Sequence, residues 1–288
     1  MITFPFRYER PSTLTEALGL LTEPGAKALA GGMSLVPMMK LRLAAPELVV
    51  DLGSVPGQKR VEAVNGHLRI GPMVTHYELE SGQTVRSACP LLAACASRIG
   101  DVQVRNAGTI GGSVAHADPS ADYPAALLAL EAEFVLTSTS GERTIAADAF
   151  FIDTFTTALE PGELITEIRV PRDAPGTGTA YEKKVQSASG FAVVGIGARV
   201  SMDGGKIARA RIGVTGLGGT PYRARNVEAL LEGSPGNSED VKAAAAVVAD
   251  GIDASSDIHA SADYRSHLAR VFTMRAIAEA IGRAGARA

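Results

Sequence analysis

The chain is poor in the residues that build metal centres and disulfide frameworks. Its 288 residues include only two cysteines, Cys89 and Cys95, together with five histidines and no tryptophan. Two cysteines are too few for an iron–sulfur ligand set or a disulfide scaffold. The histidines show neither an HExxH motif nor another paired spacing typical of a metal site. We therefore expect no metal on this chain, and we expect both cysteines to pack as small apolar groups.

A large excess of one charge and long apolar runs are also missing. The formal net charge is −3, from 28 basic and 31 acidic residues, which disfavours a general surface for nucleic acid. No apolar run approaches the roughly 18 residues that span a bilayer. The opening "MITFPFRYERPSTLTEAL" lacks the basic and apolar regions of a secretory signal. We expect a cytoplasmic protein with no membrane span and no nucleic-acid partner.

The first segment of the chain, up to residue 53, predicts a small β-α-β unit. Ser12 and Thr13 are candidate N-caps of a helix, and a short buried strand is expected over residues 26–31. A helix over residues 35–46 and a strand over residues 47–53 follow it. This alternation predicts parallel pairing at the start of the chain.

The middle of the chain mixes helices with antiparallel strands. A strand followed by a helix is expected over residues 67–81, and a further helix over residues 89–98. Residues 106–116 are rich in glycine and predict an extended loop. A strand pair should turn at Ser140-Gly141, before a strand over residues 163–171.

Residues 173–179, "DAPGTGT", have the composition of a boundary between domains. Three antiparallel strands are expected after it, with Asp203-Gly204 as a hairpin turn. The alanine-rich end of the chain predicts helices over residues 241–249 and 264–284.

Two glycine pairs stand out as candidate anion sites. Glycine lets backbone N–H groups approach a ligand closely, and successive N–H groups form a concave site for phosphate. The first candidate comprises Gly31, Gly32, Met33, Ser34 and Leu35, and the second comprises Gly111, Gly112 and Ser113, with the hydroxyls of Thr109 and Ser113 as extra donors. Two such loops suit a diphosphate held from both sides. Alternatively, each pair merely shapes a tight turn; neither fits the GxGxxG or P-loop spacing.

Taken together, the blocks "AGGMSLVPMMKLR" and "TIGGSVAHADPSADYPA" resemble the FAD-binding (medium) subunit of molybdenum hydroxylases, the carbon monoxide dehydrogenase and xanthine dehydrogenase family. "FPFRYERPSTLTEAL", "PGELITEIRVP", "GLGGTPYRARNVEALLEG" and "SADYRSHLARVFTMRAIAEA" extend the resemblance over nearly the whole chain. It implies an α+β protein with a two-lobed FAD-binding domain of the vanillyl-alcohol-oxidase (PCMH) type over residues 1–173, with lobes of about 1–55 and 56–173. A small C-terminal α+β domain over residues 178–288 would carry the three-stranded antiparallel sheet and helices.

The resemblance also implies which residues bind the cofactor. The backbone of the first loop, Ala28, Leu29, Ala30, Gly31, Gly32, Met33, Ser34 and Leu35, would hold the FAD pyrophosphate. The second loop, Thr109, Ile110, Gly111, Gly112 and Ser113, would contact it from the other lobe. Asp122 would hydrogen-bond the ribityl or ribose region, Ile99 and Ile165 would pack on the rings, and Lys183 would lie near the flavin.

Three alternatives accompany these roles. Asp122 could instead be the N-cap of the following helix. Lys183 could be a solvated strand residue, and a register shift of one residue would put Lys184 in its place. Met33 stands where many relatives carry histidine, so either a polar contact is lost there or the backbone alone grips the ligand.

The implied function is electron transfer. No catalytic residue is expected on this chain, because FAD itself carries the chemistry. Substrate would be oxidised at a molybdopterin cofactor on a large subunit, and [2Fe–2S] clusters on a small subunit would pass electrons to FAD, in a dimer of heterotrimers. The substrate and the final acceptor (NAD⁺, a quinone or oxygen) stay open. So do two alternatives, a stand-alone flavin oxidase and an assembly subunit with a decayed flavin site.

Overall fold

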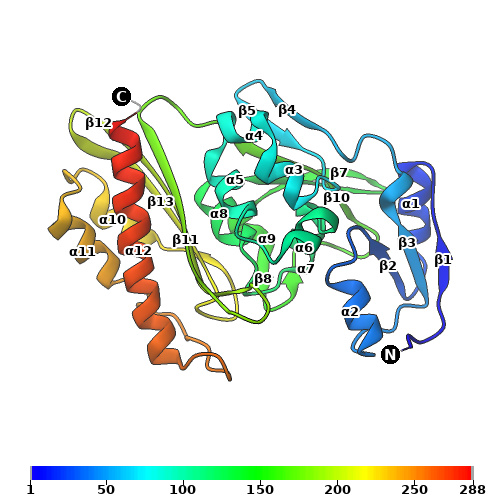
Figure 1. The fold of residues 1–288 in the computed structure, drawn as a ribbon. Coiled ribbons are helices and arrows are strands. Elements are labelled where there is room, and N and C mark those ends of the chain that lie inside the picture. Colours follow the sequence, from blue (N-terminus) through cyan, green and yellow to red (C-terminus); the bar gives the residue numbers. More distant parts are fainter. Residues whose placement is uncertain (1, 287–288) are drawn as a thin grey trace.

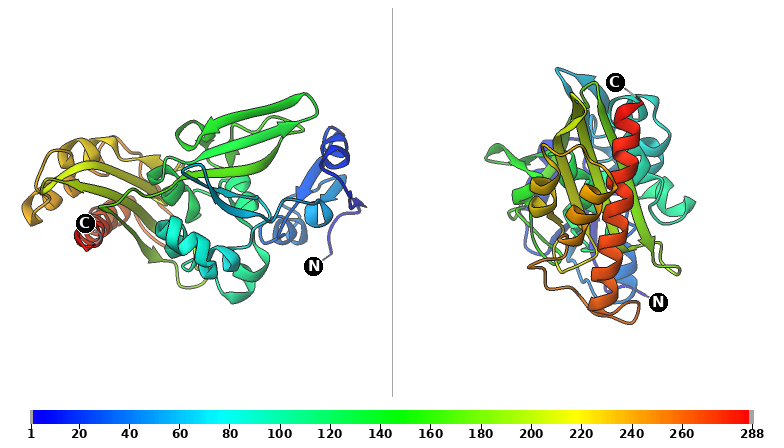
Figure 2. Two further views of the ribbon diagram at one scale, coloured as in Figure 1. Left: turned by 90° about the horizontal axis from the view of Figure 1, so that it is seen from above. Right: turned by 90° about the vertical axis from the view of Figure 1, so that its left-hand side faces the viewer.

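A computed structural model describes residues 2–286 and shows three parts arranged in chain order (Figure 1). We refer to residues 2–55 as lobe 1, residues 56–173 as lobe 2, and residues 174–286 as the C-terminal region. Each part is organised around its own main apolar cluster, and Met73 and Leu164 of lobe 2 also join the cluster of lobe 1. The two ends of the chain lie at opposite ends of an elongated molecule (Figure 2).

Lobe 1 is the predicted β-α-β unit. Its elements are β1 (Arg7–Glu9), α1 (Leu14–Leu21), β2 (Ala26–Leu29), α2 (Leu35–Lys40), β3 (Leu48–Asp51) and the 3-10 turn η1 (Leu52–Ser54). The three strands are parallel in the order β1-β3-β2. Thr13 caps α1 by accepting a hydrogen bond from the backbone N–H of Glu16. The expectation of a buried β2 is wrong, because β2 lies at the sheet edge and its residues are partly exposed.

Lobe 2 surrounds a five-stranded antiparallel sheet in the order β4-β5-β10-β6-β7. The sheet strands are β4 (Val61–Val64), β5 (His67–Ile70), β6 (Glu133–Ser138), β7 (Gly141–Ala146) and β10 (Leu164–Pro171). The remaining elements are α3 (His76–Ser81), α4 (Gln83–Ala88), α5 (Pro90–Ala96), α6 (Val102–Ala107), α7 (Ile110–His116), α8 (Tyr123–Ala129), α9 (Ala147–Phe150), β8 (Phe151–Asp153) and β9 (Thr156–Thr157). Cys89 and Cys95 are free thiols with no exposed surface, as predicted.

Residues 106–116 do not form the extended loop that the sequence predicts. They contain the end of α6 and the whole of α7, which begins after Thr109. The side chain of Thr109 accepts a hydrogen bond from the N–H of Gly112, so a standard N-cap starts a helix in spite of its two glycines. Helix propensity is a weak prior, and tertiary packing overrides it here.

The C-terminal region has one strand more than predicted. The three expected antiparallel strands are β11 (Thr177–Val185), β12 (Ala192–Asp203) and β13 (Lys206–Thr215), and the two-residue β14 (Tyr222–Arg223) extends the sheet. The turn between β12 and β13 falls after Asp203, as expected. The helices are α10 (Arg225–Leu231), α11 (Ser238–Ala246) and α12 (Ala262–Gly285), and α12 packs along β11 and β12.

Helix α8 of lobe 2 packs directly against the C-terminal sheet. Gly197 and Gly213 are paired across β12 and β13 at this contact. A Cβ atom on either residue would lie 2.9 Å and 2.0 Å, respectively, from the carbonyl oxygen of Ala125 in α8. The missing side chains let helix and sheet backbones touch, which fixes how lobe 2 meets the C-terminal region.

A cluster of charges surrounds the same contact. Glu131, two residues after the end of α8, accepts hydrogen bonds from Arg209 at 2.6 Å and from Arg211 at 2.9 Å. Burial alone would raise the pKa of Glu131, but the hydrogen bonds from these arginines outweigh it and lower that pKa. The cluster therefore joins lobe 2 to the C-terminal sheet through charge-assisted hydrogen bonds.

Within residues 2–286, no helix is both long enough and apolar enough to cross a bilayer. The same residues contain no group of three or more histidine, cysteine, aspartate or glutamate side chains placed to hold a metal ion.

Candidate cofactor site

The two glycine loops meet where lobe 1 contacts lobe 2. The first loop connects β2 to α2, and the second lies in the turn from α6 into α7 (Figure 1). A Cβ atom on Gly31 would lie 2.0 Å from the carbonyl oxygen of Ala107, and one on Gly112 would lie 3.5 Å from Cβ of Ala30. The backbones of the two lobes thus touch at these loops, as the hypothesis of a site gripped from both sides requires.

The first loop offers a run of backbone donors. Within the described chain, no hydrogen bond is donated by the N–H groups of the five successive residues from Gly31 to Leu35. The hydroxyl of Ser34 stands at the N-cap position of α2, yet its side chain makes no capping hydrogen bond. Gly32 adopts φ +72°, a conformation that favours glycine. Five N–H groups without a protein acceptor match what an oxyanion needs from a backbone cradle.

The second loop differs from the expectation. The N–H of Ile110 donates to the carbonyl of Val74, that of Gly111 to Pro72, and those of Gly112 and Ser113 to Thr109. These backbone donors are therefore already used within the protein. The hydroxyl of Ser113 has no hydrogen bond in the described structure, and that of Thr109 accepts one while its own proton stays available. Hydroxyl groups, rather than N–H groups, are what this loop can offer a ligand.

Gly111 also has a structural reason to be glycine. Its Cβ atom would lie 2.3 Å from Cβ of Pro72, and the residue is buried. Close packing inside lobe 2 is therefore sufficient to explain why this residue is glycine, without a bound ligand. The first loop therefore has more unused backbone donors than the second.

Asp122 and Lys183 form a buried ion pair between lobe 2 and the C-terminal sheet. The Nζ atom of Lys183 lies 2.8 Å from Oδ1 and 2.9 Å from Oδ2 of Asp122, and it donates to the carbonyl of Arg98 at 2.8 Å. The hydroxyl of Tyr181 donates to Oδ1 of Asp122 at 2.5 Å. The side chains of Lys183 and Asp122 are 0% and 4% exposed.

Burial raises the pKa of Asp122, and the charge and hydrogen bonds of Lys183 partly oppose that rise. Burial likewise raises the pKa of Tyr181 well above its ordinary value, so its phenol stays a proton donor. The three N–H groups of the Lys183 ammonium face three acceptor atoms, the two carboxylate oxygens of Asp122 and the carbonyl of Arg98. The carboxylate of Asp122 can accept about four hydrogen bonds and receives three, two from Lys183 and one from Tyr181. Asp122 therefore keeps capacity for one more donor, such as a ligand hydroxyl, while Lys183 is fitted to supply charge.

The surroundings of these residues bear on the alternatives that the sequence left open. Asp122 does stand at the N-cap position of α8, but its side chain makes no capping hydrogen bond. Lys183 is buried and Lys184 is exposed, so Lys183 is not a solvated strand residue. Met33 is 42% exposed and lies within the run of free N–H groups, which fits a backbone grip that does not need its side chain.

Ile99 and Ile165 lie in different surroundings. Ile99 is partly buried next to Arg98, whose carbonyl holds Lys183. Ile165 is buried in β10, against which α7 packs. One continuous segment, residues 98–113, thus runs from the ion pair through α6 to the second loop. The predicted residues form two neighbouring groups, one at the glycine loops and one at the ion pair.

Several residues that shape the site carry no recognisable signal in the sequence. The carbonyl of Ala107 and the hydroxyl of Tyr181 belong to ordinary helix and strand patterns. His76 is 4% exposed at the start of α3, with Nδ1 3.0 Å from the Tyr123 hydroxyl. Its Nε2 atom lies 2.5 Å from where a Cβ on Gly108 would stand, so this ring lies directly beneath the turn into α7.

The buried His76 predicts a pH dependence of stability. Burial first, and the charge of Arg105 second, lower the pKa of His76 from 6.5 to about 4. The imidazole of His76 therefore becomes protonated near pH 6.5 in the unfolded chain, but only near pH 4 in the folded chain. Its stabilising contribution is present above pH 6.5 and is lost as the pH falls to about 4, by about 3 kcal/mol in the free energy of unfolding.

Urea unfolding between pH 7.5 and 4 measures this slope, which is the change in the free energy of unfolding with pH. His76→Gln should flatten it, whereas the same change at the partly exposed His67 should leave it as in the unmodified chain. An unchanged slope in the His76 variant would contradict the assignment.

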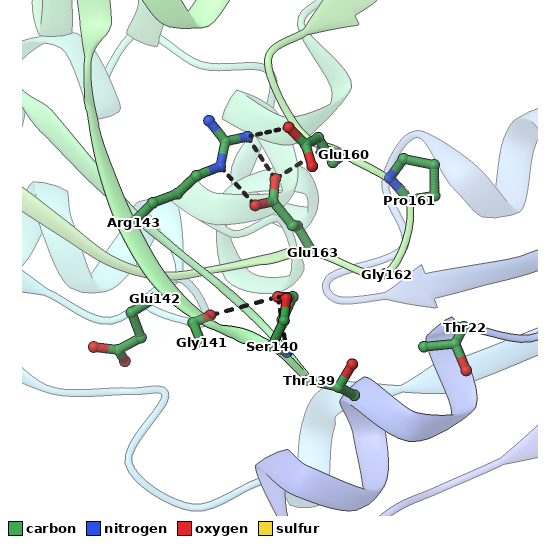
Figure 3. Close-up of a pocket in the computed structure, with 11 residues that line it drawn as sticks. Thr22, Thr139, Ser140, Gly141, Glu142, Arg143, Glu160, Pro161, Gly162 and Glu163 are labelled. Carbon is green, nitrogen blue, oxygen red and sulfur yellow. Dashed lines mark hydrogen bonds and ion pairs between the residues drawn. The ribbon is translucent and has the colours of Figure 1, made fainter.

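Two cavities lie elsewhere on the chain. One of about 290 Å³ lies between the β6–β7 turn, residues 160–163 and Thr22 of lobe 1 (Figure 3). Its Arg143 is paired with Glu163 at 2.7 Å. Another of about 190 Å³ includes Asp118, Phe191 and Arg265. None of the residues predicted to hold FAD lines either cavity.

Comparison with protein families assigns both halves of the chain. Residues 4–173 match the family model "FAD binding domain in molybdopterin dehydrogenase", and residues 179–280 match "CO dehydrogenase flavoprotein C-terminal domain". The chain belongs to this family of medium subunits. The resemblance read from the glycine loops is thereby confirmed.

Individual relatives align with this chain along nearly their whole length. The carbon monoxide dehydrogenase medium chain of Hydrogenophaga pseudoflava is 39% identical, over 96% of this chain and 97% of that relative. The nicotine 6-hydroxylase medium subunit of Paenarthrobacter nicotinovorans is 38% identical, over 95% and 96%. A solved carbon monoxide dehydrogenase of Hydrogenophaga pseudoflava superposes with a TM-score of 0.96 at 41% identity, covering 98% of this chain and 99% of that one. The predicted fold class is confirmed.

Proposed function

We propose that this chain is the FAD-binding electron-transfer subunit of a cytoplasmic molybdenum hydroxylase. The observation that carries the proposal is the run of five free N–H groups from Gly31 to Leu35, located where the second lobe makes contact. A chain of this family with such a backbone cradle is suited to hold the pyrophosphate of a dinucleotide.

The residues present fit FAD. The backbone of Ala28–Leu35 would hold the pyrophosphate, with the hydroxyls of Ser34, Thr109 and Ser113 as further donors. Asp122 would accept a hydrogen bond from a hydroxyl of the ribityl or ribose part, oriented by Tyr181 and Lys183. Ile99 and Ile165 would supply apolar surface.

FAD would supply the redox chemistry, accepting electrons and passing them to an external acceptor. The chain itself would bind and orient the cofactor and set the charge around it. A buried ammonium that is fixed on two sides, as Lys183 is, favours negative charge nearby. No side chain has to act as an acid or base on an organic substrate.

The proposal includes partners. Medium subunits of these enzymes work beside a large and a small subunit, which we expect to carry molybdopterin and the [2Fe–2S] clusters in a dimer of heterotrimers. The division into an FAD-binding domain (1–173) and a C-terminal domain (178–288) is proposed on the same grounds. Relatives whose names carry substrates as different as carbon monoxide and nicotine support placing substrate choice on another subunit.

A ligand titration tests the proposal. The purified chain should bind FAD more tightly than FMN, because FMN lacks the diphosphate and its adenosine. Ser34→Ala combined with Ser113→Ala should weaken FAD binding about tenfold through two lost hydrogen bonds. The matched control is Ser87→Ala, since the Ser87 hydroxyl bonds only to the α4 backbone.

Equal affinity for FAD and FMN would argue against a pyrophosphate cradle. Absence of FAD from both the isolated chain and the assembled enzyme would overturn the function. Turnover of an organic substrate by the isolated chain would instead indicate a stand-alone oxidase.

A further inference from the structure

Arg105, in the last turn of α6, is a mostly buried arginine to which the proposed function gives no role. Its side chain is 19% exposed, and its Nε atom donates to Oε2 of Glu80 in α3 at 2.9 Å. Its Nη1 atom donates to the carbonyl of Ile99 at 3.0 Å and to that of Gly100 at 3.4 Å. One guanidinium group thus ties the end of α6 both to α3 and to the loop that precedes α6.

The loop before α6 is held at three successive residues. Lys183 donates to the carbonyl of Arg98 at 2.8 Å, and Arg105 donates to the carbonyls of the next two residues. Gly100 adopts φ +47°, and a Cβ atom on Gly190 would lie 2.9 Å from its Cα atom. The backbone of this loop is therefore fixed between α6 and the connection from β11 to β12, and it has little freedom to move.

The stretch from Arg98 to Ala107 connects the two groups of predicted site residues. At one end, a Cβ atom on Gly31 would lie 2.0 Å from the carbonyl oxygen of Ala107, which is the contact with the first glycine loop. At the other end, Lys183 binds both Arg98 and Asp122. Between these ends lies α6, whose six residues span about 9 Å along the helix axis. This stretch therefore sets the distance between the first loop and the ion pair.

A ligand that uses both groups at once depends on this distance. In the proposed function the pyrophosphate of FAD lies at the first loop, and its flavin half extends past Ile99 toward Asp122 and Lys183. A loop that is rigid before binding does not have to be ordered by the ligand, which favours tight binding. ADP contains the diphosphate and the adenosine of FAD but no flavin, so it needs the first loop and not the ion pair.

We infer that Arg105 is a positioning residue for the flavin half of FAD. This rests on the proposed function, since it assumes that FAD spans both groups of residues. Arg105 would act through the backbone of Ile99 and Gly100, which it holds at a fixed place relative to α6, and Glu80 would orient its guanidinium group. Loss of Arg105 should therefore weaken the binding of FAD and spare the binding of ADP.

Calorimetric titration of the flavin-free, full-length chain with FAD and with ADP tests this role. Arg105→Gln should lower the affinity for FAD about tenfold through its lost hydrogen bonds, while the affinity for ADP changes less than about twofold. Arg105→Lys should behave like Arg105→Gln, because lysine keeps the charge but cannot bond α3 and the loop from one planar group. Glu80→Gln should give a smaller loss of FAD affinity, again without a loss for ADP.

Arg143 supplies the matched control. Its Nε atom donates to Oε1 of Glu163 at 2.7 Å and its Nη2 atom to the carbonyl of Ala158 at 2.6 Å, so it makes the same kind of bridge within lobe 2. It lines the cavity of Figure 3, away from the residues predicted to hold FAD. Arg143→Gln should lower the thermal unfolding temperature, as Arg105→Gln does, and should leave the affinities for FAD and ADP unchanged.

Three results would overturn this role of Arg105. Equal losses of FAD and ADP affinity in Arg105→Gln would indicate a general loosening of lobe 2. Unchanged FAD affinity in that variant would show that the loop keeps its place without the guanidinium group. Normal FAD affinity in Arg105→Lys would indicate that charge matters and position does not. Failure of the proposed function looks different: the unmodified chain would then bind neither FAD nor ADP, and the role of Arg105 would fall with it.

Discussion

Gly31→Ala should abolish retention of FAD and destabilise the contact between the lobes. The added Cβ atom would lie 2.0 Å from the carbonyl oxygen of Ala107 and 2.7 Å from Cα of Gly108. Both neighbours are backbone atoms, so the clash cannot be relieved by turning a side chain. We expect a loss of about 3 kcal/mol in the free energy of unfolding, at the upper end for overpacking. Thermal unfolding and the flavin absorbance of the purified chain measure the two effects.

Gly19→Ala is the matched control. Gly19 lies in α1, and a Cβ atom there would meet no atom within 4 Å. Alanine should stabilise this helix by about 0.5–1 kcal/mol and leave FAD retention unchanged. A Gly31→Ala chain that keeps its flavin and its unfolding temperature would show that the two lobes separate readily, and the two-sided site would then be wrong.

Lys183→Met should be the most destabilising change at the ion pair. It leaves the carboxylate of Asp122 buried with only the Tyr181 hydroxyl as a partner. Breaking one side of a buried ion pair costs about 3–5 kcal/mol. Lys184→Met, at the exposed neighbouring position on the same strand, should change stability by less than about 0.5 kcal/mol.

Two further measurements identify the cause. Asp122→Asn combined with Lys183→Met should be less destabilising than the sum of the single changes, because no charge is left unpaired. Loss of Lys183 also removes what opposes the raised pKa of Asp122. A raised carboxyl pKa favours the folded state at low pH and loses that advantage as the pH rises, so the Lys183→Met defect should shrink in acid. A defect that is additive and independent of pH would point to lost packing instead.

The sequence predicted those features that depend on local chemistry. The Thr13 cap, the loop between β2 and α2, and the turn after Asp203 all follow from short-range preferences for particular backbone conformations. These features need no knowledge of distant residues.

The features that the sequence could not predict depend on contacts between distant segments. Helix α7 forms although it contains Gly111 and Gly112, because Thr109 caps it and Pro72 packs against Gly111. The N–H groups that we expected a ligand to bind donate instead to Pro72, Val74 and Thr109. The partnership of Asp122 with Tyr181 joins residues 59 positions apart, and no local pattern marks either residue for the other.

The backbone contact of α8 with Gly197 and Gly213 also bears on how this protein can change over evolutionary time. Even one methyl group at Gly213 would meet the carbonyl of Ala125, so any larger residue at this position requires α8 to move. A gene fusion that exchanged the C-terminal region for that of a distant relative should therefore yield insoluble protein unless α8 came with it. We expect the two regions to be inherited as one module.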